Sequence, residues 1–519
     1  MQKSVVLIIR DGWGINPNTD HNAVKNALTP NIDSLLKEYP NTMLEASGKA
    51  VGLPEGYQGS SEVGHLNMGA GRIVEQEMTM IMHDIQDESF FNRPIFQKAI
   101  KNVLNNNSSL HLMGLVQDEG VHAHQDHLFA IMKYAKEHGV KKLYIHFFAD
   151  GRDTAPRSVL GYIGDVEEKI KEYGIGEIAT VMGRYYAMDR AKKWQLTTTA
   201  YDAITRAQGT RIDSIEDAIQ EAYKTRTPND KEMFDEYIPP LIVGIFNGIK
   251  DGDSVIHFNY RQDRAIQLTM AFVEDNYPGE RWKKFDIVYC GLTRYYDTFP
   301  YNMLEAMDDR EGMDNLLGQV LSRNGLRQIR ISETQKFRHV TSFFNGKRIE
   351  PFPNEEQIEI NSAYDPATFA DHPEMNACDV TNEAVKRINS NKFSLMIINL
   401  ANCDMVGHTG NYEATKRAVE VVDGCVGTII EKVLSKNKIA LITADHGNAE
   451  EMTDYKTHLP KTSHTKNPVE FIYVAEDYKN IKLREKGILS DIAPTVLYLL
   501  GIEQPSEMTS KNLITSKNP

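Results

Sequence analysis

Short apolar runs recur along the chain, and each ends abruptly at polar or glycine-rich residues. Runs of this kind predict buried β-strands. The clearest candidates are Val5–Ile9, Ser109–Leu115, Lys142–Phe148, Val255–Asn259, Phe285–Cys290, Phe393–Leu400 and Lys438–Thr443. Residues Thr415–Leu434 instead carry apolar side chains at helical spacing, immediately before the last of these strands. The alternation of strands and helices predicts an α/β protein with mainly parallel sheets.

Candidate metal ligands follow three of the predicted strands. They are Asp11 after the first strand, Asp404 and His408 after Phe393–Leu400, and Asp445 and His446 after Lys438–Thr443. A parallel sheet brings such strand ends together at its carboxyl edge. An Asp–His pair at a strand end is also common as a purely structural pair, but Gly447 permits a tight turn that would let both side chains face one point.

The spacing of the remaining ligands extends this prediction. Asp404 and His408 are four residues apart, which places both on one face of a helix. His464 lies in a polar loop before the apolar run Val469–Val474, where a lone histidine is usually just solvated. Together the six residues offer carboxylate and imidazole ligands without a thiolate. That set suits two divalent ions of the manganese, zinc, cobalt or iron type better than calcium or copper.

A serine in the glycine-rich segment 59–72 (GSSEVGHLNMGAGR) precedes a predicted helix. Ser60 or Ser61 could cap that helix by accepting hydrogen bonds from backbone amides. Alternatively, a neighbouring metal ion would lower the pKa of the hydroxyl and make it a nucleophile, while the helix N-terminus would favour a phosphate. The segment alone leaves both interpretations open.

Length and composition limit the classes of function. A chain of 519 residues exceeds what one core usually organises, so at least two domains are expected. The net charge of −14 argues against nucleic acid or an anionic membrane as a partner. The four cysteines, Cys290, Cys378, Cys403 and Cys425, are too few and scattered for a disulfide framework. With no signal-peptide pattern and no apolar stretch of about 20 residues, a cytoplasmic location is expected.

The candidate metal ligands lie near both ends of the chain, whereas the middle is rich in arginines that follow strands or occupy loops. These are Arg152, Arg184, Arg190, Arg261 and Arg264. We therefore expect one domain, residues 1–76 and 311–519, to be interrupted by another, residues 77–310. The connections would lie near 75–80 and 306–314. Two crossings make a hinge, so closure of the domains is expected.

Three long motifs resemble those of the cofactor-independent (2,3-bisphosphoglycerate-independent) phosphoglycerate mutases of the alkaline phosphatase superfamily. They are residues 59–72, residues 401–410 (ANCDMVGHTG) and residues 443–448 (TADHGN). The similarity runs over almost the whole chain. It implies an alkaline-phosphatase-like metal domain interrupted by an inserted, substrate-binding α/β domain.

The resemblance also implies roles for individual residues. One metal ion would be held by Asp404, His408 and His464, and the other by Asp11, Asp445, His446 and the nucleophile Ser61. Manganese is the expected ion, with zinc or cobalt as alternatives. The implied substrate residues are His122, Arg152, Asp153, Arg184, Arg190, Arg261, Arg264 and Lys336.

The chemistry of the side chains agrees with these roles. A phosphorylated hydroxy acid carries a phosphate and a carboxylate, and guanidinium groups bind both in bidentate fashion. Any single arginine would usually be solvated surface charge, but several in motif-like loops of an acidic protein favour a substrate site. His122, His124 and His127 have the spacing of a metal site. Because the two-metal set is complete elsewhere, His122 is interpreted as a substrate contact and the other two as structural.

The implied activity is that of an isomerase of glycolysis and gluconeogenesis, which interconverts 3-phosphoglycerate and 2-phosphoglycerate through a phosphoserine. Asp153 would be the general acid and base, Lys336 would stabilise the transferred group, and the protein is expected to be monomeric. The alternatives are phosphopentomutase or another metal-dependent phosphatase of the superfamily, although a simple phosphatase does not require the arginine-bearing insert. A non-catalytic metal-binding scaffold would need no serine at the site.

Overall fold

The computed structural model describes residues 4–517 except 229, 297, 305–312 and 457. The first predicted strand is β1 (Val5–Arg10), and it lies inside an eight-stranded sheet. In spatial order the strands are β12 (Glu355–Ile360), β11 (Gln328–Glu333), β13 (Leu395–Leu400), β1, β14 (Ile439–Thr443), β15 (Val469–Val474), β2 (Asn41–Glu45) and β17 (Lys486–Ile488). All neighbouring pairs are parallel except those of β15, which runs antiparallel to both β14 and β2.

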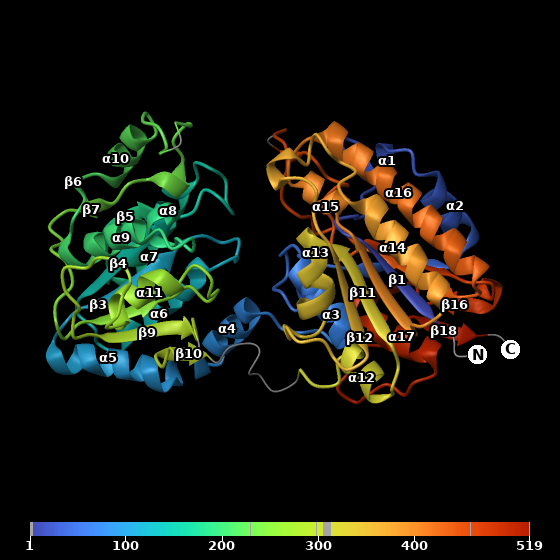
Figure 1. The fold of residues 1–519 in the computed structure, drawn as a ribbon. Coiled ribbons are helices and arrows are strands. Elements are labelled where there is room, and N and C mark those ends of the chain that lie inside the picture. Colours follow the sequence, from blue (N-terminus) through green and yellow to red (C-terminus); the bar gives the residue numbers. More distant parts are fainter. Residues whose placement is uncertain (1–3, 229, 297, 305–312, 457, 518–519) are drawn as a thin grey trace. The chain divides into compact units, whose positions relative to one another are not determined.

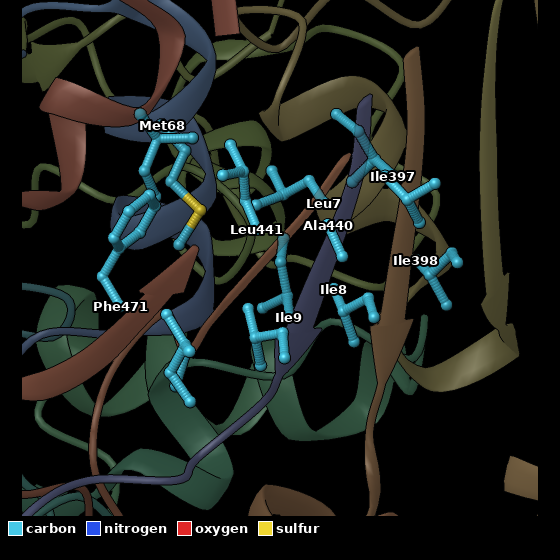
Figure 2. Close-up of a cluster of buried hydrophobic side chains, with 14 of the residues drawn as sticks. Leu7, Ile8, Ile9, Met68, Ile397, Ile398, Ala440, Leu441 and Phe471 are labelled. Atoms are coloured by element: carbon cyan, nitrogen blue, oxygen red, sulfur yellow. The ribbon is translucent and has the colours of Figure 1, made fainter. Parts of the chain in front are cut away.

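The three central strands form the core of this sheet. Every residue of β1, β13 and β14 is buried, as in a parallel sheet covered on both faces. Their registers align Val5 with both Leu395 and Ile439. Figure 2 shows side chains of these strands, among them Leu7, Ile397 and Leu441, packed in one apolar cluster. The buried strands hold the loops at their carboxyl ends in fixed positions.

Helices cover this sheet and carry the loops that follow its strands. They are α1 (Ala23–Asn26), α2 (Pro30–Glu38), α3 (Ser61–Ala70), α12 (Leu317–Arg323), α13 (Thr334–Arg338), α14 (Ala377–Ser390), α15 (Asn402–Gly407), α16 (Tyr412–Ser435) and α17 (Ile492–Leu500). Helices α14 and α16 pack against each other, and α17 contacts both α3 and β1. A small sheet pairs β16 (Ile481–Leu483) with β18 (Ile514–Lys517).

The chain between these segments forms its own eight-stranded sheet. Its spatial order is β10 (Asn302–Leu304), β9 (Val288–Thr293), β8 (Ser254–His257), β3 (Leu110–Leu115), β4 (Leu143–Ala149), β5 (Glu177–Gly183), β7 (Leu241–Val243) and β6 (Thr210–Ile212). The first six strands are parallel, and β7 runs antiparallel to β5. The helices are α4 (Glu77–Gln86), α5 (Pro94–Asn106), α6 (Gln125–Glu137), α7 (Val159–Tyr173), α8 (Arg184–Ala187), α9 (Trp194–Arg206), α10 (Ile215–Ala222) and α11 (Ile266–Val273).

The chain thus divides into two compact units, coloured by sequence in Figure 1. Unit 1 comprises Met1–Gln76 and Arg310–Pro519, and unit 2 comprises Glu77–Asp309. Part of the predicted connection at 75–80 is helical, because α4 begins at Glu77. The other predicted connection, 306–314, lies for the most part outside the described residues.

The predicted mainly parallel α/β class is confirmed, and most predicted strands begin and end within two residues of the observed ones. The strand predicted at Phe285–Cys290 is wrong at both ends, since β9 is Val288–Thr293 and lies three residues later. The Phe285 ring packs on Trp282, and the backbone amide of Asp286 donates to an Asp251 carboxylate oxygen over 3.0 Å, which holds this segment as a loop. Among the described residues, no helix has the length and apolar character needed to cross a bilayer.

Candidate active site

The carboxyl ends of β1, β13 and β14 bring three aspartates together in unit 1. Asp11 directly follows β1, and its backbone amide donates to Leu400 O of β13 over 3.1 Å. The amide of Asp404 donates to Asp11 O over 3.1 Å, and Gly12 N donates to Asp445 Oδ1 over 3.2 Å. Gly12 has φ of +76°, and a Cβ there would lie 2.7 Å from the Cα of Asp404. The close approach of these loops therefore requires glycine.

Asp404, His408 and His464 form one group of potential ligand atoms. Asp404 Oδ1 lies 3.2 Å from Nε2 of each histidine, and the two Nε2 atoms are 3.1 Å apart. Asp404 and His408 lie one turn apart, at the start and the C-cap of α15. His464 precedes β15, which is antiparallel to β14, so its loop meets the edge where β14 ends. The strand direction explains how a distant loop histidine reaches this group.

Asp11, Asp445, His446 and Ser61 form the second group. Ser61 Oγ lies 2.8 Å from His446 Nε2 and 3.2 Å from Asp11 Oδ1. Potential ligand atoms of Asp11, Asp445 and His446 lie within 4.8 Å of one another, and so do those of Asp404, His446 and His464. His446 is therefore within reach of both groups.

The geometry distinguishes the two serines that the sequence left open. Ser60 is the N-cap of α3, and its side chain accepts a hydrogen bond from Val63 N over 3.4 Å. Ser61 is buried and turned toward His446 and Asp11. Gly64 lets α3 approach this edge, because a Cβ there would lie 2.6 Å from Asp445 O. Ser61 is thus the hydroxyl within the cluster.

Each of the three histidines is oriented by a backbone carbonyl. The Nδ1 atoms lie 2.7 Å from Thr462 O for His408, 3.2 Å from Gly447 O for His446 and 2.9 Å from Gly59 O for His464. A carbonyl can only accept, so each Nδ1 carries the proton. In the neutral forms of His446 and His464, Nε2 then presents a lone pair to the cluster, whereas the Asp404 carboxylate raises the pKa of His408 and favours its cationic form. This tautomer is the one that orients an imidazole for metal binding.

Lys336, on α13, places its ammonium among the carboxylates. Its Nζ lies 2.6 Å from Asp11 Oδ1, 2.6 Å from Asp404 Oδ2 and 2.5 Å from Ser61 Oγ. Burial opposes the charged form of Lys336, but Asp11 and Asp404 outweigh it and raise the pKa of the ammonium. Lys336 therefore remains a cation beside the Ser61 hydroxyl.

Burial and neighbouring charges set the protonation of the potential ligands. Burial raises the pKa of Asp11 to about 7, with Asp445 adding to the effect. Burial likewise opposes ionisation of Asp404, yet Lys336 and His408 outweigh it and hold the pKa of that carboxyl well below its usual range. Burial lowers the pKa of His446 and of His464, which favours their neutral forms. Neutral imidazoles and ionised carboxylates are the forms that bind metal ions.

In unit 2, arginines and aspartates meet at the carboxyl edge of the sheet. Arg184 directly follows β5, and its Nη1 lies 2.6 Å from Asp150 Oδ1 and 2.5 Å from Asp153 Oδ2. Arg190 Nη1 lies 2.6 Å from Asp263 Oδ2, and Arg261 Nε lies 3.3 Å from Asp263 Oδ1. These contacts gather cationic side chains around three carboxylates.

The remaining predicted residues of unit 2 belong to the same neighbourhood. Burial lowers the pKa of His122, and the positive charges of Arg184, Arg261, Arg264 and Arg190 lower it further. Arg264 donates to Met188 O over 3.0 Å, and burial together with nearby arginines lowers its pKa to about 10. Arg152 points its Nη1 to Glu236 Oε1 at 3.4 Å. The arginines around His122 therefore create a local positive potential, which would attract an anionic ligand.

The histidine series of unit 2 does not gather into a metal site. Within the described residues, groups of potential ligands occur only in unit 1. His122 Nε2 lies 3.8 Å from Asp153 Oδ2, among the arginines. His124 is the N-cap of α6, and the His127 ring lies against Tyr260.

Comparisons with known proteins agree with this geometry. The metalloenzyme superfamily model matches residues 3–504. A relative from Acetivibrio thermocellus, named 2,3-bisphosphoglycerate-independent phosphoglycerate mutase, is 46% identical, with 99% of each chain covered. A relative of the same name from Clostridium botulinum is 48% identical, again over 99% of each chain. The chain belongs to the 2,3-bisphosphoglycerate-independent phosphoglycerate mutase family.

A solved structure of a phosphoglycerate mutase also matches. The Leishmania mexicana phosphoglycerate mutase, crystallised at low cobalt concentration, superposes with a TM-score of 0.78 at 29% identity. The alignment covers 99% of this chain and 98% of that one. The fold and the predicted family membership are therefore confirmed together.

The donor set of this mutase-family chain fits divalent metal ions. Three buried carboxyl groups lie around the Lys336 ammonium, and burial together with the charge of Asp445 raises the pKa of Asp11. The buried Oδ2 of Asp445 has no hydrogen-bond partner among the described residues. His65 Nδ1 lies 3.4 Å from it and lies 2.9 Å from Ser61 O. A buried, unpaired carboxylate oxygen is costly unless a cation neutralises it.

Several residues that contact the potential metal ligands were not predicted from the sequence. Asn399 donates to Asp11 Oδ2 over 2.7 Å and lies 3.1 Å from His65 Nε2. Glu450 accepts from Gly14 N over 3.0 Å and from Asn448 N over 2.8 Å, and so ties two ligand loops together. Asn399 could have been found as the polar residue in an otherwise apolar strand, whereas nothing in the sequence distinguishes Glu450.

Proposed function

We propose that this chain interconverts 3-phosphoglycerate and 2-phosphoglycerate, without 2,3-bisphosphoglycerate, through a phosphoserine at Ser61. The names of its full-length relatives support this activity. The observation that carries the proposal is the position of the Ser61 hydroxyl, 2.8 Å from His446 Nε2 and 2.5 Å from Lys336 Nζ. A serine capping a helix for stability alone would not require a buried ammonium and an imidazole lone pair beside its oxygen.

Ser61 is the proposed nucleophile. Ser61 would enter the reaction already ionised, with Lys336 stabilising the negative charge on Oγ, so its proton is not transferred during the cycle. The ionised Oγ attacks phosphorus while the bond from phosphorus to the substrate oxygen breaks, which leaves glycerate and a phosphoserine. Lys336 donates to Oγ and stabilises negative charge there. In the return step, the other hydroxyl of glycerate attacks phosphorus and the bond to Ser61 Oγ breaks. Attack by water on the phosphoserine would release phosphate instead, so the site must exclude water.

Unit 2 is the proposed binding unit for the carboxylate and phosphate of the substrate. Arg184, Arg190, Arg261 and Arg264 lie close enough to depress the pKa of the same histidine, His122, and guanidinium groups bind such anions in bidentate fashion. Arg152 and His122 complete the proposed set. Asp263 neutralises two of these arginines, and an anionic ligand would compete with it for them.

Asp153 is the proposed general acid and base. Its carboxylate is held 2.5 Å from Arg184 Nη1 and is 22% exposed, so it is both oriented and accessible. In the proposed reaction Asp153 protonates the leaving hydroxyl oxygen and accepts the proton of the attacking one. The net proton balance of the mutase reaction is then zero.

We further propose that unit 1 holds two divalent ions, manganese with zinc or cobalt as alternatives. Asp404, His408 and His464 would hold one, and Asp11, Asp445, His446 and Ser61 the other. Bound divalent ions would lower the pKa of the serine hydroxyl and neutralise charge on the phosphoryl oxygens. Elemental analysis should give two ions per chain, and His464→Ala should retain one.

A direct assay tests the activity. The purified chain is incubated with manganese and 3-phosphoglycerate, without bisphosphoglycerate, and 2-phosphoglycerate and free phosphate are followed separately. We expect 2-phosphoglycerate without matching phosphate, and loss of turnover in Ser61→Ala. Release of phosphate alone would favour a phosphatase, and turnover that survives Ser61→Ala would exclude the phosphoserine.

A further inference from the structure

A buried aspartate of unit 2 anchors the loop that follows β4. Asp235 is fully buried and begins a short 3-10 helix, Asp235–Tyr237. Its Oδ2 accepts from the backbone amides of Ser158 and Val159, each over 2.8 Å. The Asp235 amide in turn donates to Pro156 O over 2.9 Å. Asp235 thus holds both the end of this loop and the start of α7.

Asp235 supplies the capping interaction that the start of α7 lacks locally. Ser158 is the N-cap of α7, but its side chain makes no capping hydrogen bond, and its hydroxyl donates to Ala155 O over 2.8 Å. The first amides of a helix need acceptors from elsewhere, and a carboxylate is favoured at that end of the helix dipole. The other oxygen of Asp235, Oδ1, accepts from the Tyr223 hydroxyl. Both oxygens of the buried carboxyl group are therefore engaged.

Two glycines let the segment that begins at Asp235 lie directly against the strand ends. Gly151 has a φ of +68°, and a Cβ there would lie 2.7 Å from the Asp235 Cβ. A Cβ on Gly183, the last residue of β5, would lie 2.1 Å from Glu236 O. The Gly183 amide also donates to Ile238 O over 2.8 Å. Backbone therefore packs on backbone here, which leaves the loop little freedom to shift.

The anchored loop carries two residues of the proposed substrate site. Arg152 and Asp153 lie between Gly151 and Pro156, and thus between the two points at which Asp235 contacts the loop. Arg152 Nη1 also lies 3.4 Å from Glu236 Oε1, on the residue next to Asp235. A misplacement of reacting groups by about 1 Å can lower a rate about 100-fold. The Asp235 anchor therefore bears directly on catalysis.

We propose that Asp235 is a positioning residue, which holds the loop so that Arg152 binds the substrate and Asp153 reaches its hydroxyl groups. Because Asp235 is fully buried, it acts only through the loop. The inference rests on the proposed function, in which Arg152 and Asp153 have these roles. Release of the loop should slow the mutase reaction and also loosen the grip on glycerate. Water would then compete for the phosphoryl group on the phosphoserine, so more phosphate should be released for each 2-phosphoglycerate formed.

Hydrogen exchange tests the anchor independently of activity. In Asp235→Ala, the amides of Ser158 and Val159 lose their acceptor, and the loop should open locally. We expect exchange of the 152–159 amides to be about tenfold faster than in the parent protein, as for loss of a helix cap. Asp235→Asn keeps an acceptor oxygen, so its exchange should stay near that of the parent. Unchanged exchange in Asp235→Ala would overturn the anchor.

Kinetics of the manganese-loaded full chain test the positioning role. With 3-phosphoglycerate as substrate, Asp235→Ala should raise KM and lower kcat. The ratio of phosphate released to 2-phosphoglycerate formed should rise at least about tenfold, because glycerate and the phosphoserine are no longer held in register. Asp235→Asn should restore most of both losses. A merely structural role would lower both products in proportion and leave the ratio unchanged.

Asp423 on α16 offers a matched control. It is also buried and caps a helix at a distance, because its Oδ1 accepts from Ile32 N over 2.8 Å and its Oδ2 from Asn31 N over 3.2 Å, at the start of α2. Asp423→Ala should be destabilised as Asp235→Ala is, yet keep the product ratio of the parent.

The outcomes separate the two levels of inference. A parental product ratio in Asp235→Ala, or an equal rise in Asp423→Ala, would overturn the positioning role. A parent chain that forms no 2-phosphoglycerate would overturn the proposed function, and with it the role of Asp235 in that reaction. Faster exchange in Asp235→Ala would still identify Asp235 as the anchor of the loop in that case.

Discussion

Lys336 Nζ lies 2.5 Å from Ser61 Oγ although 275 residues separate them in the chain. The same ammonium touches Asp11 and Asp404, so one side chain links the serine to two proposed metal ligands. We expect Lys336→Met to lower kcat by about 100- to 1,000-fold, because a charge-assisted donor to the reacting oxygen is lost. Steady-state kinetics measure this effect, and exposed Lys392→Met is the control. A change confined to KM would contradict the proposed role of Lys336.

Asn399 should control metal affinity without being a ligand. It donates to Asp11 Oδ2 over 2.7 Å and lies 3.1 Å from His65 Nε2. Asn399→Ala should weaken metal binding about 10- to 100-fold, as loss of a residue that orients a ligand usually does. Titration of the chelated protein with manganese measures the affinity, with exposed Asn480→Ala as the control. Activity should recover at saturating manganese, and failure to recover would point to a different role.

Asp150 should stabilise the arginine site of unit 2. Its Oδ1 accepts from the amides of Arg152 and Asp153, each over 3.1 Å, and from Arg184 Nη1 over 2.6 Å. Asp150→Ala leaves the buried Arg184 guanidinium with one carboxylate fewer, so we expect a loss of about 3 kcal/mol in the free energy of unfolding. Asp150→Asn keeps the acceptor oxygen and should lose less.

The Asp150 series is measured by chemical denaturation and by kinetics on the same preparations. Exposed Asp286→Ala should match the parent protein in both. KM for 3-phosphoglycerate should rise in Asp150→Ala, because Arg184 and Asp153 lose their common partner. An equal loss of stability in Asp150→Ala and Asp150→Asn would show that the oxygen acceptor is not what matters.

Glu333, the last residue of β11, predicts a pH dependence of stability. Burial raises the pKa of its carboxyl from 4.5 to about 7, against the opposing effect of the Asn376 backbone amide. The folded state therefore binds this proton more tightly than the unfolded state does. The contribution of Glu333 to stability is complete below pH 4.5, falls as the pH rises toward 7 and is lost above it.

Glu333→Gln should remove this dependence. Above pH 7 the variant should be more stable than the parent, by up to about 3 kcal/mol for a shift of this size, and near pH 4.5 the two should be equal. Urea unfolding across this pH range measures the difference. If the stability of the variant relative to the parent is the same at pH 5 and pH 8, the Glu333 carboxyl does not titrate as its burial predicts.

Removal of metal should destabilise unit 1. Asp11, Asp404 and Asp445 are nearly inaccessible to water, and bound cations would relieve the repulsion between their carboxylates. Chelation should lower the thermal midpoint by several degrees, and manganese should restore it in proportion to its concentration. Ser61→Ala keeps all three carboxylates, so the effect of chelation should persist there after catalysis has been abolished.

The sequence predicted the sheet edge on which the site is built. Asp11, Asp404 and Asp445 each follow a continuous apolar run, and parallel strands place their carboxyl ends together. The residue types and the strand topology therefore both predicted a site at this edge. The start of β9 was not predictable in this way. The apolar side chains of Phe285 and Ile287 predicted a strand, but contacts with a distant loop hold this segment in a non-strand conformation.

Residues whose positions depend on tertiary contacts were harder to predict from the sequence. His464 reaches its neighbours because β15 is antiparallel, and strand direction in a mixed sheet depends on tertiary packing rather than on local pattern. Glu450 ties Gly14 to Asn448, and each of these contacts exists only after distant segments meet. Only the resemblance to a known family, and not the residue pattern, singled out Ser61 and Lys336 from similar side chains.

The position of β1 has a consequence for biosynthesis. Val5 pairs with Leu395 on one side and Ile439 on the other, so both neighbours of β1 are synthesised long after it. Unit 2, Glu77–Asp309, is translated in between and can fold while β1 is still without partners. An apolar strand that stays unpaired during translation is prone to aggregate, and pairing of strands so far apart in sequence is slow. Nascent chains of this protein should therefore depend on chaperones until translation has passed β14.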